Sequence, residues 1–133
     1  MRVPVLDASA LLAYIRQEPG YERVRDAIAE GAAISVVNVA EALSVEAAEG
    51  IDPAQLTAEL RRVGVLGGAL AVHGMTEDDA VEAARLRPLT KAAGLSLGDR
   101  ICVALTRRLD GVALSADRPW QKAKLDVAVE LIR

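Results

Sequence analysis

Four acidic residues, Asp7, Glu41, Asp99 and Asp117, occupy similar places relative to the predicted elements of the chain. Asp7 and Asp117 directly follow short apolar runs that resemble β-strands, while Glu41 and Asp99 lie in the first turns of predicted helices. In a parallel α/β fold, the strands end and the following helices begin at one edge of the sheet. We therefore expect the four carboxylates to converge at that edge.

Carboxylates that converge in this way repel one another unless a cation joins them. Oxygen ligands suit hard divalent ions such as Mg²⁺ or Mn²⁺, which keep several water molecules when bound. An ion of this kind generates hydroxide from water and stabilises charge on a phosphate group. The sequence therefore predicts a Mg²⁺ site, with Mn²⁺ as the alternative, at which the four acids are metal ligands and catalytic residues; for Asp117 the alternative is that it holds a metal-bound water.

Each acid also has a local structural interpretation. Asp7 suits the N-cap of the helix that follows it, and Asp117 suits the start of a turn. Glu41 and Asp99 each lie three residues after a residue that suits an N-cap, which is the spacing of a capping box. The two pairs are Asn38–Glu41 and Ser96–Asp99. Taken together, however, the capping roles do not explain why four like charges should share one edge.

The rest of the composition excludes several other kinds of site. His73 and Cys102 are the only residues of their types, so a His/Cys zinc site, an internal disulfide and a Ser–His–Asp triad have no candidates. Neither a Walker-type phosphate loop nor a G-x-G-x-x-G motif is present. Aromatic residues make up only 2% of the chain, which argues against a base-stacking platform. Cys102 is predicted to be a small buried hydrophobe, and Trp120 a partly buried cover for the Asp117 turn.

Short strand-like runs alternate with longer helical patterns along the chain, which favours an α/β fold with a mainly parallel sheet. The 133 residues suit one domain, residues 1–133. Pro4 weakens the first strand, because proline cannot donate to a ladder. The predicted strands are residues 3–6, 32–36, 65–72, 112–115 and 127–132, and the predicted helices are residues 8–16, 21–30, 39–49, 53–63, 76–86 and 97–109.

No apolar run approaches the ~20 residues of a membrane span, and the N-terminal run is too short for a signal peptide. We therefore expect a cytoplasmic protein without membrane contact. The net charge is −3, but residues 1–84 carry 6 basic and 14 acidic side chains while residues 85–124 carry 9 basic and 3 acidic ones. This asymmetry indicates one basic face, with Arg118 and Lys122 nearest the acids; the alternative is that these residues only solubilise helix surfaces.

Three sequence blocks resemble the PIN-domain family, and more closely the VapC toxins of prokaryotic VapBC toxin–antitoxin pairs. The first block is Val5-Leu6-Asp7-Ala8-Ser9-Ala10-Leu11, the second is Val39-Ala40-Glu41-Ala42-Leu43, and the third is Gly94-Leu95-Ser96-Leu97-Gly98-Asp99-Arg100 followed by Ala113-Leu114-Ser115-Ala116-Asp117. Their order and spacing agree with the family over nearly the whole chain. Ser9 and Ser115 match supporting positions, although a local backbone hydrogen bond would explain either one.

The resemblance implies a three-layer sandwich and a metal-dependent endoribonuclease that cleaves RNA. It also implies neutralisation by a VapB-like antitoxin and assembly into a homodimer. In line with this, we expect an antitoxin helix or a second copy to cover apolar surface on the N-terminal helices; the alternative is that this surface packs into the chain's own core. The residues concerned are Leu43, Val45, Leu56, Leu60 and Val63.

Three other functions remain to be weighed against this one. Haloacid-dehalogenase-like phosphatases need a second Asp two residues after the first, where this chain has Ser9. Receiver domains need an acidic pair near the first strand and a late Lys, whereas Asp7 has no acidic neighbour and Arg118 follows Asp117. The alternative from another class is a catalytically inert PIN-like module that binds RNA or protein.

Overall fold

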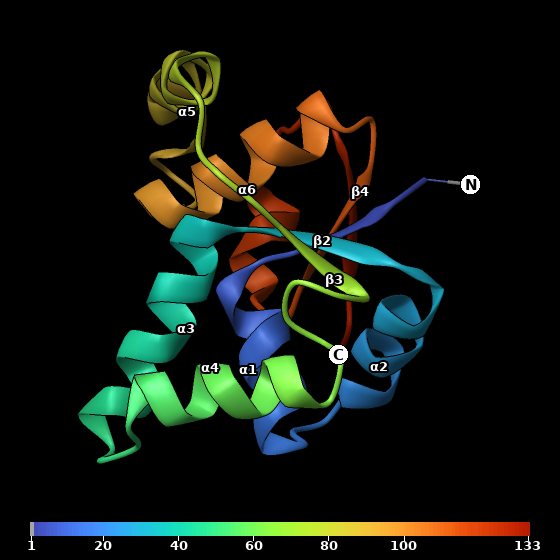
Figure 1. Cartoon of the computed structure of the whole chain (residues 1–133). Helices are drawn as coiled ribbons and strands as arrows, with labels where there is room; N and C mark the ends of the chain where they lie inside the picture. The colour runs from blue at the N-terminus through green and yellow to red at the C-terminus, as the bar shows by residue number, and fades with distance from the viewer. Residues whose placement is uncertain (1) are drawn as a thin grey trace.

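The computed structural model describes residues 2–133 and contains a five-stranded sheet in which every pair of neighbouring strands is parallel. The strand order is β3-β2-β1-β4-β5, so the first strand lies at the centre (Figure 1). The strands are β1 (Pro4–Leu6), β2 (Ala32–Ser35), β3 (Leu70–His73), β4 (Val112–Ser115) and β5 (Ala128–Leu131). The predicted α/β architecture with a parallel sheet is confirmed.

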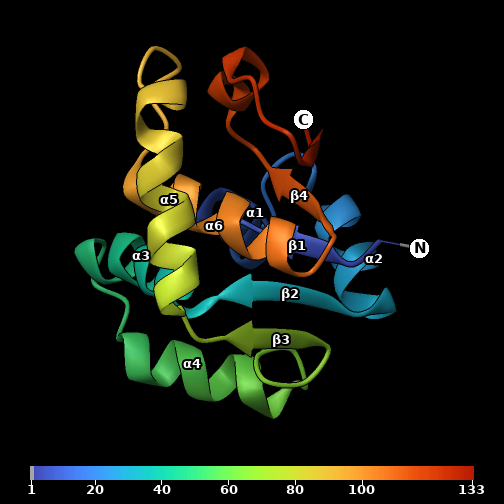
Figure 2. The ribbon, with the colours of Figure 1, turned by 90° about the horizontal axis from the view of Figure 1, so that it is seen from above.

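Helices cover both faces of this sheet and form the two outer layers (Figure 2). The helices are α1 (Ala8–Arg16), α2 (Tyr21–Glu30), α3 (Val36–Ala48), α4 (Pro53–Arg62), α5 (Glu77–Thr90), α6 (Leu97–Arg108) and the 3₁₀-helix η1 (Arg118–Lys122). In residues 2–133, none of them is long and apolar enough to cross a bilayer.

Alternation along the strands divides the core between the two faces. Leu6 and Leu114 pack with side chains of α1, α2 and α4, whereas Val5 and Ala113 pack with side chains of α6 and η1. Cys102 belongs to this second cluster and is fully buried, as predicted. The molecule is therefore a three-layer sandwich whose central strands contribute to both cores.

The start of α3 differs from the sequence prediction. The helix begins at Val36, and the hydroxyl of Ser35 caps it by accepting a hydrogen bond from the Val37 amide at 3.2 Å. Asn38 therefore lies inside the first turn and is buried, so its predicted role as the cap is wrong. Glu41 moves accordingly from the first turn of the helix to the second.

Two other elements have different lengths from those predicted. The strand expected over residues 65–72 is confined to β3, because Gly64 and Gly67 turn the chain at φ values of 81° and 75°. Helix α5 begins with a capping box formed by Thr76 and Asp79, and it continues past the predicted end at residue 86, through Pro88, to Thr90. Pro4 is the first residue of β1, a position that proline tolerates within a sheet.

Candidate metal centre

Three of the four predicted acids meet at the carboxyl edge of the sheet. Asp7 follows β1, Asp117 follows β4, and Asp99 lies in the first turn of α6. Each offers a carboxylate oxygen, and these three oxygens lie within 4.8 Å of one another. The three side chains range from buried Asp7 through half-buried Asp99 to exposed Asp117, so the cluster opens from the core to the surface.

Asp7 combines the capping role with its place in the cluster. Its Oδ1 accepts hydrogen bonds from the Ala10 amide at 2.8 Å and from the Ser9 hydroxyl at 2.7 Å. Its Oδ2 accepts from the Ser115 hydroxyl at 2.5 Å. Burial raises the pKa of Asp7 to about 7; the serine and amide hydrogen bonds oppose this rise, and the charge of Asp117 adds to it.

The two serines connect Asp7 to the loop that carries Asp117. The Ser9 hydroxyl accepts from the Ala116 amide at 2.8 Å, and the Ser115 hydroxyl accepts from the Asp117 amide at 3.0 Å. Each hydroxyl therefore donates to Asp7 and accepts from the loop after β4. This network fixes the Asp7 carboxylate and holds the Asp117 backbone beside it.

Asp99 forms the predicted capping box with Ser96. Its Oδ2 accepts from the Ser96 amide at 2.9 Å, while the Asp99 amide donates to the Ser96 hydroxyl at 3.1 Å. Asp117 precedes η1, but its side chain makes no capping hydrogen bond. Partial burial and the charge of Asp99 raise the pKa of Asp117, and the charge of Arg133 opposes them.

Glu41 lies beside this compact cluster, outside the group of three. The Asn38 side-chain amide donates to Glu41 Oε1 at 2.8 Å and to the Gly98 carbonyl at 3.0 Å, so it links α3 to the start of α6. A Cβ at Gly98 would overlap the Glu41 carboxylate. Partial burial raises the pKa of Glu41, the Asn38 hydrogen bond lowers it, and the charges of Asp99 and Asp117 raise it further.

Sequence reasoning missed the contributions of Asn38 and Gly98. Two signals pointed to them: an amide inside the apolar run 36–40, and a glycine directly before Asp99 at the start of a helix. The expected Asn38–Glu41 capping box is replaced by a contact between the two side chains, because Ser35 already caps the helix.

Two residues next to the cluster serve the fold. Arg100 is only 6% exposed and donates to the Ala83 carbonyl at 2.8 Å, so it holds α5 against α6 and makes no salt bridge with Asp99. Trp120 is 2% exposed within the second core cluster, more deeply buried than the predicted partial cover.

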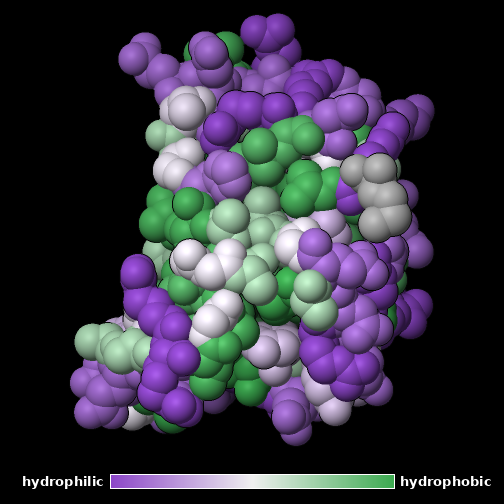
Figure 3. Space-filling view, turned by 45° about the vertical axis from the view of Figure 1, so that its right-hand side comes forward, coloured by the Kyte–Doolittle hydropathy of each residue, from purple (hydrophilic) through white to green (hydrophobic). Residues whose placement is uncertain are grey.

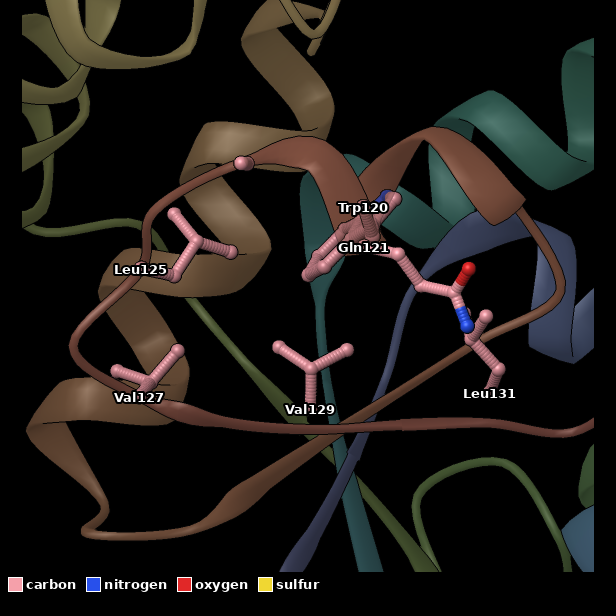
Figure 4. A pocket seen from close by; sticks show the side chains of 7 residues that line it. Trp120, Gln121, Leu125, Val127, Val129 and Leu131 are labelled. Atoms are coloured by element: carbon pink, nitrogen blue, oxygen red, sulfur yellow. The ribbon is translucent and has the colours of Figure 1, made fainter.

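The hollow beneath η1 differs chemically from the acid cluster. It has a volume of about 330 Å³ and is lined by Trp120, Gln121, Ala123, Leu125, Val127, Val129 and Leu131. Figure 4 shows these side chains between η1 and β5. None of the lining side chains is ionisable, so this hollow lacks the groups that the predicted chemistry requires.

The donor set of the acid cluster fits a hard divalent cation. Its ligands are carboxylate oxygens from three separate segments, and within residues 2–133 none of the three acids forms a salt bridge. Raised pKa values of Asp7 and Asp117 show that the metal-free site disfavours full ionisation. A bound cation would relieve this cost, which is how carboxylate sites for Mg²⁺ or Mn²⁺ work.

Comparisons with known proteins agree with this geometry. The family model of the PIN domain matches residues 5–125. No curated protein matches the chain. Among solved structures, DNA-bound VapBC from Salmonella typhimurium has a TM-score of 0.73 at 15% identity, covering 100% of both chains.

Two further solved structures have the same fold. FitAcB from Neisseria gonorrhoeae has a TM-score of 0.68 at 21% identity, covering 96% of each chain. VapC20 from Mycobacterium tuberculosis, described as a toxin that cleaves the sarcin–ricin loop, has a TM-score of 0.73 at 16% identity, covering 92% of this chain and 95% of that one. With a family model that spans most of its length and a fold that agrees, the chain belongs to the PIN-domain family.

Proposed function

We propose that this protein is a Mg²⁺- or Mn²⁺-dependent endoribonuclease toxin that hydrolyses RNA phosphodiester bonds and is neutralised by a cognate antitoxin. The observation that carries the proposal is the cluster of Asp7, Asp99 and Asp117, whose carboxylate oxygens lie within 4.8 Å of one another and form no salt bridge with a basic residue in the described part of the chain, residues 2–133. Membership of the PIN-domain family supports a nuclease, and the VapC20 toxin of the same fold is described as RNA-loop cleaving.

Each site residue has a separate task in this mechanism. A divalent cation bound at the cluster supplies Lewis-acid stabilisation of negative charge on the phosphodiester. Asp7, Asp99 and Asp117 would hold the cation, and Ser9 and Ser115 hold the Asp7 carboxylate in one orientation.

Glu41 lies at the side of the cluster, where Asn38 orients it. In place of direct metal binding, we assign Glu41 the role of a general base. It would accept a hydrogen bond from the water molecule that attacks the phosphodiester and take up a proton from that water during hydrolysis. Its raised pKa suits this task, because a general base works best when its pKa approaches the working pH.

The proposed RNA contacts lie directly after Asp117. Arg118 and Lys122 are exposed on η1, and neither forms a salt bridge within residues 2–133. They are therefore free to contact phosphates of an RNA strand that reaches the cluster, as predicted from the chain's charge distribution.

The proposed antitoxin site is a groove between α1, α2 and α4. It has a volume of about 390 Å³ and is lined by Tyr14, Ile15, Gln17, Tyr21, Arg25, Leu56, Glu59 and Leu60. Solved complexes of the same fold, such as VapBC from Salmonella typhimurium, contain an antitoxin partner, which supports this assignment. Of the predicted apolar residues, Leu60 packs into the chain's own core, whereas Val45 and Val63 remain 41% and 52% exposed.

Apolar surface elsewhere supports the predicted homodimer. Figure 3 shows hydrophobic side chains gathered in the middle of one face, with hydrophilic residues around them. Exposed apolar side chains also occur on three helices, namely Val36 of α3, Val81 and Leu89 of α5, and Leu97 of α6. We propose that a second copy of the chain covers part of this exposed apolar surface in a homodimer. Sedimentation analysis of the purified chain tests for the dimer directly.

The decisive experiment measures cleavage of a random-sequence RNA pool with Mg²⁺, with Mn²⁺, with EDTA, and by the Asp99→Asn variant. We expect cleavage with either ion, none with EDTA and none by the variant, whose Asn keeps an oxygen for the capping box with Ser96. Cleavage that persists in EDTA would overturn the metal mechanism. RNA binding without cleavage under every condition would favour the inert PIN-like module.

A further inference from the structure

Arg133 lies beside the acid cluster because of the way β5 pairs with β4. The two strands are parallel, with Ser115 opposite Leu131, and the Ile132 amide donates to the Ser115 carbonyl at 2.9 Å. Asp117 and Arg133 each follow this pair by two residues, so both lie past the ends of neighbouring strands, at the carboxyl edge of the sheet. The register therefore brings a cation to the same edge as the acid cluster.

The guanidinium of Arg133 is only partly used by the protein. Its Nη1 donates to the Pro19 carbonyl at 3.1 Å and lies 3.6 Å from a Glu18 carboxylate oxygen. Within residues 2–133, no acceptor is found for its Nε or Nη2, and the side chain is 38% exposed. The Nε–Nη2 edge of an arginine is the fork that binds two oxygens of one phosphate.

Arg133 also acts electrostatically on the site. Its positive charge lowers the pKa of Asp117, against the opposing effects of burial and of the Asp99 charge. Among residues 2–133, Arg133 is the one basic side chain that contributes in this way to the pKa of Asp7, Glu41 or Asp117.

We propose that Arg133 binds a phosphate of the RNA strand through its Nε–Nη2 edge and so positions the strand over the metal centre. This inference rests on the proposed nuclease function. An RNA strand that approaches a group of carboxylates meets repulsion, and a cation next to Asp117 offsets that repulsion where the phosphate must enter. Glu18 and Pro19 contact the guanidinium through Nη1, so its Nε–Nη2 edge remains for a ligand.

The alternative is that Arg133 only anchors the end of β5 to the α1–α2 loop. This loop packs closely on the same segment, since a Cβ at Gly20 would overlap the Ile132 carbonyl. Arg23 provides a matched control. It also anchors β5, through Glu130 at 2.6 Å, and its side chain is 36% exposed, but its charge is not among the causes of the shifted pKa values of Asp7, Glu41 and Asp117.

The experiment compares Arg133→Gln, Arg133→Lys and Arg23→Gln in the full chain. Binding to a fluorescently labelled pool of random 20-nucleotide RNA is measured with Mg²⁺ at several salt concentrations, in an Asp99→Asn background that prevents cleavage. We expect Arg133→Gln to weaken binding about tenfold, as for the loss of one charge-assisted contact, and to reduce the slope of log K against log salt by about 0.7. Arg133→Lys should restore the slope but only part of the affinity, because Lys keeps the charge without the fork.

The outcomes separate this inference from the function on which it rests. If Arg133→Gln behaves like Arg23→Gln, with an unchanged salt slope, Arg133 is an anchor and the inference is wrong, while the nuclease proposal stands. If Arg133→Lys loses as much slope as Arg133→Gln, charge is not the basis of the contact and the inference is again overturned. A parent protein that neither binds nor cuts RNA overturns both proposals.

Discussion

The two ends of helix α6 use acidic residues in opposite ways. At its N-terminal end, Asp99 meets Asp7 and Asp117, and none of the three forms a salt bridge within residues 2–133. At its C-terminal end, two arginines form salt bridges with acidic residues. The pairs there are Arg107 with Glu82 and with Asp126, and Arg108 with Asp79 at 3.1 Å.

The pKa values of two buried acids show what this difference means. Burial is the largest influence on both Asp7 and Asp79, and in both it raises the pKa. For Asp79 the hydrogen bonds and charge of Arg108, with hydrogen bonds from Thr76, outweigh burial and bring the pKa below its ordinary value. For Asp7 nothing compensates fully, and the pKa rises to about 7. Ion-paired acids thus stabilise the folded chain, whereas the unpaired acids impose a cost that a bound metal ion would relieve, as the proposed function requires.

The largest expected effect comes from a substitution in the acid cluster at the N-terminal end of α6. Asp7→Asn removes one negative charge from the cluster, and we expect it to reduce RNA cleavage by at least ~10³-fold, since a metal ion supplies several kcal/mol of transition-state stabilisation. Its side-chain oxygen can still accept from the Ala10 amide, so the start of α1 should survive. Cleavage assays and thermal unfolding of both proteins measure the two effects.

The same substitution distinguishes the two interpretations of Asp7. If Asp7 were only a helix cap, the variant would cleave RNA at the parent rate and change little in stability. If the cluster is a metal site, the metal-free variant should unfold at a higher temperature than the metal-free parent at neutral pH, because a buried, uncompensated charge has gone.

The second prediction concerns the pH dependence of the metal-free protein. The folded-state pKa of Asp7 lies at about 7, above the unfolded value near 3.8, so the folded state binds more protons in this interval. Stability is therefore highest at the acidic end of the interval and falls as the pH rises from about 4 to about 7. The raised pKa values of Glu41 and Asp117 act in the same direction.

Unfolding by urea in EDTA, at several pH values from 5 to 8, tests this prediction. We expect the free energy of unfolding to fall over this range by a few kcal/mol, and saturating Mg²⁺ to flatten or reverse the trend. The Asp7→Asn variant in EDTA should show a weaker dependence of the free energy of unfolding on pH than the parent does. A metal-free parent that becomes more stable towards pH 8 would show that its site carboxylates are compensated by some other group.

The meeting of the three aspartates could be predicted from the sequence, whereas the surroundings of Glu41 could not. Asp7 and Asp117 follow strands of a parallel sheet, and Asp99 begins a helix, so chain order alone was enough to predict their meeting. The surroundings of Glu41 were not predictable, because Ser35 and Asn38 both suit an N-cap and only the packing of α3 on α6 selects Ser35.

Register imposes a similar limit on the last strand. The existence of β5 was predicted from its apolar residues, but its alignment with β4 depends on packing across the sheet. The common position of Arg133 and Asp117 at the carboxyl edge of neighbouring strands follows from that alignment, which cannot be predicted from the sequence of either segment alone. Likewise, the pairing of Arg108 with Asp79 required the fold, because 29 residues separate them.

The third prediction sharpens the role of Glu41. Gly98→Ala places a methyl group where the Glu41 carboxylate lies, and Asn38→Ala removes the amide that holds it. Because both changes act on Glu41 and leave the three aspartates in place, we expect each to lower cleavage by about 10- to 100-fold. In a Glu41→Gln background, neither change should reduce cleavage much further; independent losses would mean that they disturb the start of α6 itself.

The smallest effect is expected at the paired end of α6. Arg108→Gln leaves the nearly buried Asp79 carboxylate with hydrogen bonds from its capping box but without its cation. We expect a loss of about 1–2 kcal/mol in the free energy of unfolding, and RNA cleavage equal to that of the parent.

Because Arg108 lowers the pKa of Asp79, the stability that this pair provides is present above the ordinary pKa value of 3.8 and is lost as the pH falls below it. The deficit of the variant should therefore shrink in acid. Arg62→Gln is the control, because it removes a solvent-exposed pair with Glu59 and should leave the free energy of unfolding almost unchanged. Impaired cleavage by Arg108→Gln at unchanged stability would connect the two ends of the helix, and the division between them would then be wrong.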